Sequence, residues 1–441
     1  MQVRITVIGT GYLGVTHAAC MAELGFEVMG LDVDVEKVAA LAAGHVPFYE
    51  PGLQELMQKQ IAAGRLSFTC DYTELAEWAG DGAVHFISVG TPQKQGEYAA
   101  DMTYVDTAFE SLARAIAHQG RSLVVGKSTV PVGTANRVAA MVAGIAPNAE
   151  VAWNPEFLRE GWAVKDTLHP DRLVIGVRSA EAEADLRQVY ARLLEEEVPL
   201  VVTDFPTAEL VKVSANSFLA VKISFINAMA EVCEAAGADV MQLSEALSHD
   251  PRIGGRYLVP GLGFGGGCLP KDIRAFMARA GELGVDQALA FLKEVDAINM
   301  RRRARTVDLA REQCDGSLLG KRVAVWGAAF KPDSDDIRDS PALNVAASIN
   351  LQGAQVTVYD PKAMDNARKM FPTLSYASSA MEAAQQADVI LHLTEWQEFR
   401  DLDPVAVRGQ VRGARIIDSR NALDAAAWRT AGWTYRALGR P

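Results

Sequence analysis

A glycine run that ends in a cysteine is the stretch of this sequence best suited to chemistry. Residues 263–272 read Gly-Phe-Gly-Gly-Gly-Cys-Leu-Pro-Lys-Asp. Glycine lets a backbone approach a ligand closely, and Pro270 suits the first turn of a helix. A helix beginning there would place Cys268 at its N-terminus, where the peptide dipoles favour a thiolate, with Asp272 one turn away. The stretch therefore predicts a nucleophile beside a carboxylate, although a lone cysteine is usually a small buried hydrophobic residue.

A second glycine pattern lies near the start of the chain. Residues 3–8 predict a buried strand, residues 9–14 read Gly-Thr-Gly-Tyr-Leu-Gly, a helical pattern follows, and a strand over 27–31 ends at Asp32. Strand, G-x-G-x-x-G, helix, strand and acid within about 30 residues indicate a dinucleotide-binding unit. Its glycines allow a tight turn and the approach of a pyrophosphate to the helix N-terminus. Asp32 would accept hydrogen bonds from the adenosine ribose, which favours NAD over NADP.

Two threonines follow the next predicted strands. Strands are expected over 83–89 and 123–129, with Thr91 and Thr129 at their carboxyl ends. Ligands bind at this edge of an open parallel sheet. The same hydroxyls could instead cap the following helices, which is a common use of threonine.

Charged residues among apolar ones mark two later places. Glu156 and Glu160 are four residues apart; on a helix they would share a face and repel, so they indicate either solvated surface or a site. One long helix is predicted over about 207–236, with Lys212 and Asn216 one turn apart. Lys212 could extend to water or, buried in a site, stabilise an oxyanion.

The second half of the chain predicts more helix and then a new α/β unit. A helical region covers about 271–314 with an interruption near 281–284, and strands are expected at 322–327, 355–360, 388–393 and 414–418. This half lacks the full glycine fingerprint and would bind a different nucleotide or none. We predict an α/β fold with two doubly wound Rossmann-like domains joined by a central helical segment, over residues 1–200, 201–314 and 315–441.

Composition narrows the function classes. The chain has 441 residues, 49% hydrophobic and 22% charged, as expected of a soluble protein with two or three domains. A net charge of −12 argues against nucleic-acid binding. The five scattered cysteines show neither metal-ligand spacing nor a disulfide framework, which fits a reducing cytoplasm. We found no signal peptide and no apolar run of the ~18–20 residues that cross a membrane.

Motifs along essentially the whole chain resemble the UDP-glucose/GDP-mannose dehydrogenase family. They lie at 9–14, 48–53, 127–134, 154–161, 209–216 and 263–272, together with Phe330 and Lys331. The resemblance implies oxidation of a sugar nucleotide's primary alcohol to a carboxylate with two NAD. It favours UDP-glucose as substrate, with GDP-mannose or a UDP-N-acetyl-hexosamine as alternatives. It also implies a homodimer in which Arg252 reaches the partner's site.

The resemblance assigns Cys268 the role of nucleophile. Its thiolate would trap an aldehyde as a thiohemiacetal, which becomes a thioester on the second hydride transfer and is hydrolysed by water. Lys212 and Asn216 would stabilise the oxyanions.

Further roles follow from the same resemblance. Asp272 would orient Lys212 and the hydrolytic water, and Glu156, with Thr129, would act as general base. The implied NAD site comprises Gly9, Gly11, Tyr12, Leu13, Gly14, Asp32, Lys37, Thr91, Thr129, Glu160, Lys271 and Arg338. The implied sugar-nucleotide site comprises Glu156, Phe157, Leu158, Lys212, Asn216, Arg252, Tyr257, Gly265, Phe330, Lys331 and Arg420. No metal is expected.

Overall fold

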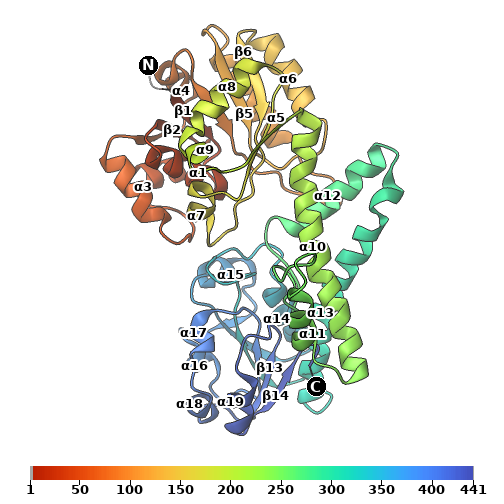
Figure 1. Cartoon of the computed structure of the whole chain (residues 1–441). Helices are drawn as coiled ribbons and strands as arrows, with labels where there is room; N and C mark the ends of the chain where they lie inside the picture. The colour runs from red at the N-terminus through yellow and green to blue at the C-terminus, as the bar shows by residue number, and fades with distance from the viewer. Residues whose placement is uncertain (1–2, 441) are drawn as a thin grey trace. The chain divides into compact units, whose positions relative to one another are not determined.

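A computed structural model describes residues 3–440 (Figure 1). The chain divides into two compact units. Of the described residues, unit 1 holds 3–215 and 274–283, and unit 2 holds 216–273 and 284–440. Two helices, α10 (Phe205–Ala236) and α12 (Leu269–Glu282), contribute residues to both units. Within residues 3–440, no helix combines the length and the apolar character needed to cross a bilayer.

Unit 1 is built on one eight-stranded sheet with the order β3-β2-β1-β4-β5-β6-β7-β8. Its first six positions follow the doubly wound order of dinucleotide-binding folds. The strand pairs are parallel except β6 with β7. The strands are β1 (Arg4–Ile8), β2 (Glu27–Leu31), β3 (Leu66–Thr69), β4 (Val84–Ile87), β5 (Ser122–Gly126), β6 (Ala149–Trp153), β7 (Leu173–Gly176) and β8 (Leu200–Thr203).

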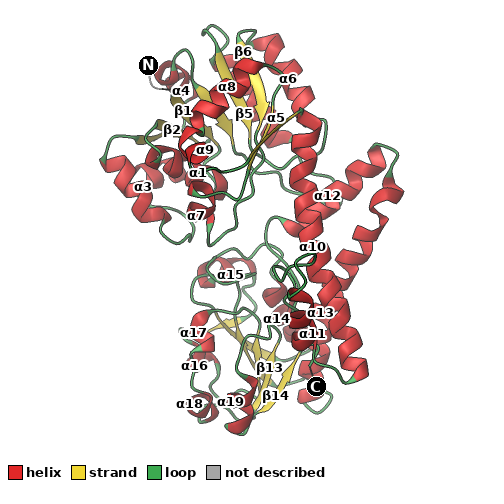
Figure 2. Cartoon of the chain, viewed as in Figure 1, coloured by secondary structure: helices red, strands yellow, loops and turns green. Residues whose placement is uncertain are grey.

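Both faces of this sheet are buried. Along β5, Leu123 and Val125 belong to one apolar cluster and Val124 to another, because successive side chains of a strand point to opposite faces. Helices pack around the strands, as Figure 2 shows in red and yellow. They are α1 (Tyr12–Glu23), α2 (Val35–Ala42), α3 (Leu53–Ala62), α4 (Tyr72–Ala79), α5 (Thr103–Ala115), α6 (Thr134–Ile145), α7 (Ala163–Leu168), α8 (Ala180–Val189) and α9 (Ala191–Glu195).

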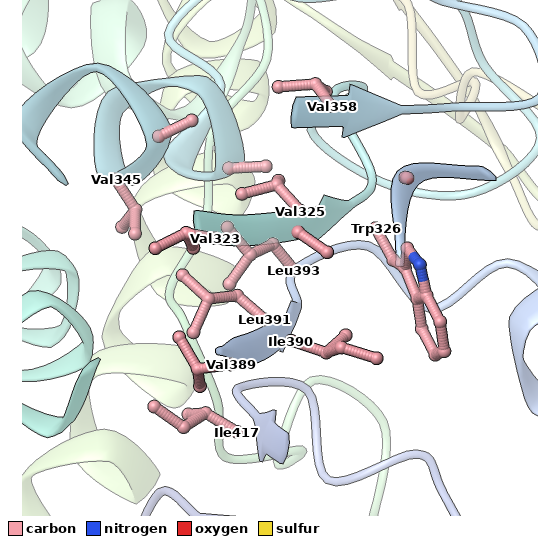
Figure 3. Packing of buried hydrophobic residues seen from close by; sticks show 14 of the residues in the cluster. Val323, Val325, Trp326, Val345, Val358, Val389, Ile390, Leu391, Leu393 and Ile417 are labelled. Carbon is pink, nitrogen blue, oxygen red and sulfur yellow. The ribbon is translucent and has the colours of Figure 1, made fainter. Parts of the chain in front are cut away.

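Unit 2 contains a second parallel sheet with the order β11-β10-β9-β12-β13-β14. Figure 3 shows valines 323 and 325 of its central strand β9 packed among apolar side chains of the neighbouring strands. The order repeats that of the first sheet, which confirms the predicted pair of doubly wound folds. The strands are β9 (Arg322–Trp326), β10 (Gln355–Tyr359), β11 (Ser375–Tyr376), β12 (Val389–His392), β13 (Arg415–Asp418) and β14 (Thr434–Ala437).

The helices of unit 2 fall into two groups. The first group precedes the sheet in the chain: part of α10, α11 (Val240–Ser248), the first turn of α12, the 3-10 helix Asp286–Leu289, and α13 (Ala290–Gln313). The second group alternates with the strands: α14 (Pro341–Leu351), α15 (Met364–Met370), α16 (Ala380–Ala383), α17 (Gln397–Arg400), α18 (Pro404–Arg408) and α19 (Ala425–Thr430).

Candidate active site

The turn between β1 and α1 has room for a pyrophosphate. Helix α1 begins at Tyr12 after Gly11, and no side chain caps its first N–H groups. A Cβ on Gly11 would meet nothing within 4 Å, whereas one on Gly14 would lie 1.8 Å from the carbonyl oxygen of Gly9. Gly14 therefore permits close packing of helix on turn, and Gly11 leaves open space beside uncapped amides, including that of Leu13. These residues fit a dinucleotide phosphate.

Asp32 directly follows β2 and is a buried carboxylate that accepts several hydrogen bonds. Its Oδ2 accepts hydrogen bonds from the Thr10 N–H at 2.9 Å, the Thr10 hydroxyl at 3.0 Å and the Lys37 ammonium at 2.9 Å. Burial alone would raise the pKa of Asp32, but the bonds from Lys37, the Asp34 N–H and Thr10 together hold that pKa below its ordinary value. Asp32 is therefore ionised at neutral pH and can accept hydrogen bonds from ribose hydroxyls.

The substitution Asp32→Asn should raise the KM for NAD about 10-fold or more, because hydrogen bonds to a charged acceptor contribute ~1.5–3 kcal/mol. It should also narrow the preference for NAD over NADP. Steady-state kinetics with both cofactors measures the change. Asp34→Asn is the matched control: Asp34 caps α2 through the Lys37 N–H, and asparagine caps equally well. Equal KM values for the wild type and Asp32→Asn would contradict the prediction.

Thr91 and Thr129 lie together at the carboxyl edge of the first sheet. The Thr91 hydroxyl donates to the carbonyl oxygen of Thr129 at 2.9 Å. Thr91 is buried and Thr129 is half-buried. The bond joins the segments that follow β4 and β5, so both residues stand where the strand pattern predicts ligands.

Glu156 and Glu160 do not share a helix face. Residues 154–162, called here the 154–162 loop, form no helix or strand, so the helical spacing considered for this pair is wrong. The Glu156 carboxylate turns back to accept the N–H of Leu158. Asn154 follows the end of β6 and starts the loop, and Pro155 disfavours helix at the residue before it. Both glutamates are half-buried.

A buried polar network lies at the start of the 154–162 loop, and sequence reasoning did not find it. The Lys127 ammonium donates to Asn154 Oδ1 at 2.9 Å and lies 3.8 Å from Glu156 Oε2. The Tyr190 hydroxyl donates to the same Asn154 oxygen at 2.6 Å. Burial lowers the pKa of Lys127, Glu156 opposes that shift and Lys212 adds to it. The sequence signal that could have revealed this network was Lys127 itself, a lysine directly after an apolar strand.

The Phe157 ring lies near two cations. Its ring centroid is 4.0 Å from the Arg172 guanidinium carbon and 5.6 Å from the Lys212 ammonium. Lys212 is 8% exposed, so it does not extend freely into water. The 154–162 loop thus places a carboxylate and an aromatic ring near buried positive charge, an arrangement suited to anionic groups.

In unit 2, Cys268 is exposed immediately before the first residue of α12. The Asp272 N–H donates to the Cys268 carbonyl at 3.0 Å, so the predicted helical turn between them is present. Asp272 is 2% exposed; its Oδ2 accepts from Asn216 Nδ2 at 2.6 Å and its Oδ1 from the Lys271 ammonium at 2.6 Å. The role of Asp272 toward Lys212, and that of Lys271 toward NAD, stay predictions.

The glycines before Cys268 make close contacts, and the contact of Gly265 is with backbone. A Cβ on Gly265 would lie 2.3 Å from the Asp339 carbonyl oxygen, and one on Gly267 2.3 Å from Cζ of Arg338. Gly266 has φ +84°, and its Cβ would lie 2.9 Å from the Phe330 ring. The structure therefore brings Phe330 and Arg338, two predicted site residues, against the glycine run.

Gly265→Ala should lower the free energy of unfolding by about 1–3 kcal/mol, because a tightly packed backbone cannot accept an added methyl group without shifting. Urea denaturation measures the loss. Gly281→Ala, also glycine to alanine, is the control: a Cβ on Gly281 meets nothing within 4 Å, and alanine favours helix α12. Equal free energies of unfolding for Gly265→Ala and wild type would contradict the prediction and show that the backbone around Gly265 can shift to accept a methyl group.

Arg420 joins three segments of unit 2. Its guanidinium donates to the carbonyl oxygens of Leu393 at 2.7 Å, Gly263 at 3.0 Å and Phe330 at 3.0 Å. It also lies 3.3 Å from Glu395. Arg420, which follows β13, therefore holds the glycine run and the segment of Phe330 that follows β9. Its binding of substrate stays a prediction.

The remaining predicted substrate residues also lie in unit 2. Tyr257 has φ 65°, a left-handed conformation uncommon for aromatic residues. The Lys331 ammonium is 5.4 Å from the Phe330 ring centroid. The Arg252 side chain is 88% exposed and pairs with Asp250 at 2.6 Å.

The second sheet has an acid in the position of Asp32, but its surroundings differ. Asp360 follows β10 and is 1% exposed. Its oxygens accept the N–H groups of Ala328 and Ala329 and the indole N–H of Trp396, among others. This carboxylate binds the backbone of the turn after β9. That use fits a half of the chain that lacks the full G-x-G-x-x-G motif. Within residues 3–440, no cluster of three or more His, Cys, Asp or Glu side chains could hold a metal ion.

Comparison with known proteins covers the whole chain. Residues 3–194 match the NAD binding domain of the UDP-glucose/GDP-mannose dehydrogenase family, 206–301 its central domain and 324–425 its UDP binding domain. A UDP-glucose 6-dehydrogenase of Rhizobium meliloti is 40% identical over 99% of this chain and 100% of its own.

Solved structures agree. A UDP-glucose dehydrogenase from Pyrobaculum islandicum has a TM-score of 0.91 and 37% identity, covering 100% of this chain and 98% of its own. A UDP-D-ManNAc dehydrogenase from Pyrococcus horikoshii has a TM-score of 0.85 and 27% identity, covering 99% of each chain. With the dinucleotide turn, the exposed cysteine and these matches together, the chain belongs to the UDP-glucose/GDP-mannose dehydrogenase family.

Proposed function

We propose that this chain oxidises UDP-glucose to UDP-glucuronate in two successive two-electron steps, with NAD accepting both hydrides. The observation that carries the proposal is the exposed Cys268 at the start of α12, one turn from the buried Asp272. A two-electron alcohol dehydrogenation has no use for a thiol, whereas oxidation through to an acid gains from covalent capture of the aldehyde. The relatives named UDP-glucose 6-dehydrogenase, at 38–40% identity over 99% of the chain, support the choice of sugar.

Cys268 holds the sugar covalently between the two oxidations. Once the C6 alcohol has lost a hydride and its hydroxyl proton, the Cys268 sulfur adds to the aldehyde carbon and forms a thiohemiacetal. Loss of the second hydride and the remaining hydroxyl proton gives a thioester. Lys212 and Asn216 stabilise the negative oxygen at each stage. NAD, when bound, supplies the hydride acceptor.

Glu156 releases the product. It takes a proton from a water molecule that Thr129 helps to hold, and the resulting hydroxide attacks the thioester carbon. The carbon–sulfur bond breaks, the carboxylate leaves and the Cys268 thiolate is restored. The overall change converts one alcohol, two NAD and one water to one carboxylate, two NADH and three protons.

The binding roles are proposed in the same way. Residues 1–200 carry the NAD site, 201–314 the central helical segment and 315–441 the sugar-nucleotide domain. Asp32 and Lys37 bind the adenosine ribose, and Thr91, Glu160, Lys271 and Arg338 complete the cofactor site. The substrate is held by Phe157, Leu158, Arg252, Tyr257, Gly265, Phe330, Lys331 and Arg420. The three cationic side chains among them balance the negative charge of the diphosphate.

Counting reduced cofactor tests the function. Purified protein supplied with NAD and UDP-glucose should form two NADH for each UDP-glucuronate detected by mass spectrometry. GDP-mannose and UDP-N-acetyl-hexosamines are assayed in parallel, since the same chemistry suits them. One NADH per turnover with no acid refutes the four-electron reaction; a higher kcat/KM for another sugar nucleotide refutes the choice of UDP-glucose.

We further infer a homodimer formed through α10. Phe218, Phe225 and Val232 repeat every seven residues along that helix and are 65%, 48% and 57% exposed. Seven residues are nearly two helical turns, so the three side chains form one apolar stripe of the kind that packs against an equivalent helix. The exposed Arg252 then reaches the partner's site, as the family resemblance implies.

Sedimentation velocity tests the assembly. The double substitution of Phe218 and Phe225 by lysine should convert dimer to monomer, because two charges replace the apolar contact. Leu351→Lys and Met370→Lys, which charge exposed apolar residues elsewhere in unit 2, form the control and should leave the dimer intact. A wild-type monomer at micromolar concentration, or a dimer that survives the double substitution, contradicts the inference.

A reducing, cytoplasmic location is also proposed. The structure forms no disulfide at Cys20, Cys70, Cys233, Cys268 or Cys314, and Cys70 and Cys268 are exposed. An exposed nucleophilic thiol would be oxidised in a secretory compartment. Activity in a cytosolic fraction, with loss after mild oxidation and recovery with dithiothreitol, is the expected result.

A further inference from the structure

The motif at residues 48–53 has no role in the reaction described so far. Its sequence builds a tight turn: the Leu53 N–H donates to the Glu50 carbonyl at 3.2 Å, with Pro51 and Gly52 between them. Gly52 has φ 74° and ψ −4°, which with proline before it is typical of a type II turn. The turn fixes the backbone of Glu50 directly before α3.

The side chain of Glu50 reaches the far end of the 154–162 loop. Glu50 is 5% exposed. Its Oε2 accepts the Gly161 N–H at 2.6 Å and its Oε1 accepts the Ala163 N–H at 2.7 Å. One carboxylate thus holds two backbone amides where the loop enters α7. Bonds of this kind to a charged acceptor are stronger than neutral ones.

The same amide also contacts the cofactor turn. The Gly161 N–H donates to the Tyr12 hydroxyl at 3.0 Å as well. Tyr12 is the first residue of α1, and its ring centroid lies 4.7 Å from that of Phe48. Glu50 and Tyr12 therefore converge on one backbone group, and the dinucleotide turn is linked to the end of the 154–162 loop.

The beginning of this loop is held separately. The Lys127 ammonium lies 3.8 Å from Glu156 Oε2 and 2.9 Å from Asn154 Oδ1. Midway, the Arg159 guanidinium pairs with Asp166 of α7. Because α7 starts at Ala163, loss of the Glu50 bonds removes the carboxylate that holds the Gly161 and Ala163 amides. The end of the loop is then held by the Tyr12 hydroxyl and the Arg159–Asp166 pair.

We propose that Glu50 is a positioning residue: it fixes the 154–162 loop so that Glu156 meets the hydrolytic water at the thioester. The inference rests on the proposed function for the role of Glu156, and on the contacts above for the role of Glu50. A small displacement of a catalytic group costs up to about 100-fold in rate. The step affected is release of the acyl group from Cys268, not its formation.

Hydrogen exchange tests the contact without any turnover. Glu50→Gln keeps the size of the side chain but replaces one acceptor oxygen with a donor. The amides of Gly161 and Ala163 should exchange at least 10-fold faster in this variant, while the β1–α1 peptide keeps its protection. Asp71→Ala, which removes the carboxylate that caps α4 through the Thr73 N–H, is the control and should leave both amides protected. Unchanged exchange in Glu50→Gln overturns the proposed contact.

Rapid kinetics tests the consequence. Glu50→Gln mixed with NAD and UDP-glucose should give a burst of two NADH per Cys268, followed by a steady state about 10- to 100-fold slower than wild type. Intact-protein mass spectrometry should find the acyl adduct on Cys268 during that steady state. A merely destabilised enzyme would lose burst amplitude and show no adduct. Faster exchange with a normal steady state, or a slow steady state without adduct, overturns the positioning role.

A second variant, Tyr12→Phe, tests the same backbone contact if Glu50→Gln does not fold. Tyr12→Phe removes only one of the acceptors at the Gly161 amide, so exchange at Gly161 should quicken with Ala163 unchanged. Failure of the proposed function is read from the wild type alone: if it forms no acid, the kinetic arm fails while the exchange arm still decides the contact.

Discussion

Replacing Cys268 by serine should reduce the formation of UDP-glucuronate by about 10³-fold or more, because a serine hydroxyl without a base is a poor nucleophile toward an aldehyde. The first hydride transfer does not need the sulfur, so a trace of NADH is expected without acid. Product analysis by mass spectrometry, together with the ratio of NADH to acid, measures both. Full turnover in Cys268→Ser would refute the thioester route.

Cys70 provides the matched control for that experiment. It is also exposed and forms no disulfide, but it follows β3, an edge strand separated from β4 by β2 and β1. Cys70→Ser should keep full activity. Iodoacetamide should then inactivate Cys70→Ser with one label at Cys268, and acid formation by the labelled protein would contradict the role of the thiol.

The local parts of the site could be predicted from the sequence. The dinucleotide turn, the end of β2 at Asp32 and the helical turn from Cys268 to Asp272 each depend on neighbours within a few residues. Their glycine, proline and acid positions restrict the backbone directly. The long helix predicted over 207–236 is α10, Phe205–Ala236, since apolar periodicity continues without a break.

Contacts between distant segments could not be predicted. Lys127 meets Asn154 because β5 and β6 are neighbours in the sheet, and Tyr190 reaches the same oxygen from the end of α8. Glu50 contacts Gly161, 111 residues away. The spacing of residues along the chain does not predict such pairs, because they form only when distant segments pack together in the folded protein.

The two similar acids show where a sequence pattern stops being informative. Asp32 and Asp360 both follow the second strand of a doubly wound sheet. Asp32 faces a turn with open space at Gly11, whereas Asp360 accepts backbone and indole N–H groups at 1% exposure. The position in the fold is shared, but the donors around each carboxylate decide its use.

Glu156→Gln should stall the enzyme at the thioester. An amide cannot take a proton from water, and loss of a general base costs about 10²–10⁴-fold. The capture of the aldehyde by Cys268 does not require Glu156, so a burst of two NADH per active site should precede the slow phase. Quenched-flow measurement of NADH and intact-protein mass spectrometry of the acyl adduct report the two phases.

Glu160→Gln separates this role from a general effect on the 154–162 loop. Both residues are half-buried glutamates of the same loop, and both changes remove one negative charge. Because Glu160 is proposed to contact NAD, its substitution should raise the KM for NAD without accumulating the adduct. Adduct in both variants would mean that any disturbance of the loop blocks hydrolysis; adduct in neither would assign the base to another residue. Only accumulation confined to Glu156→Gln, relieved at higher pH where hydroxide replaces the missing base, supports deprotonation of water by Glu156.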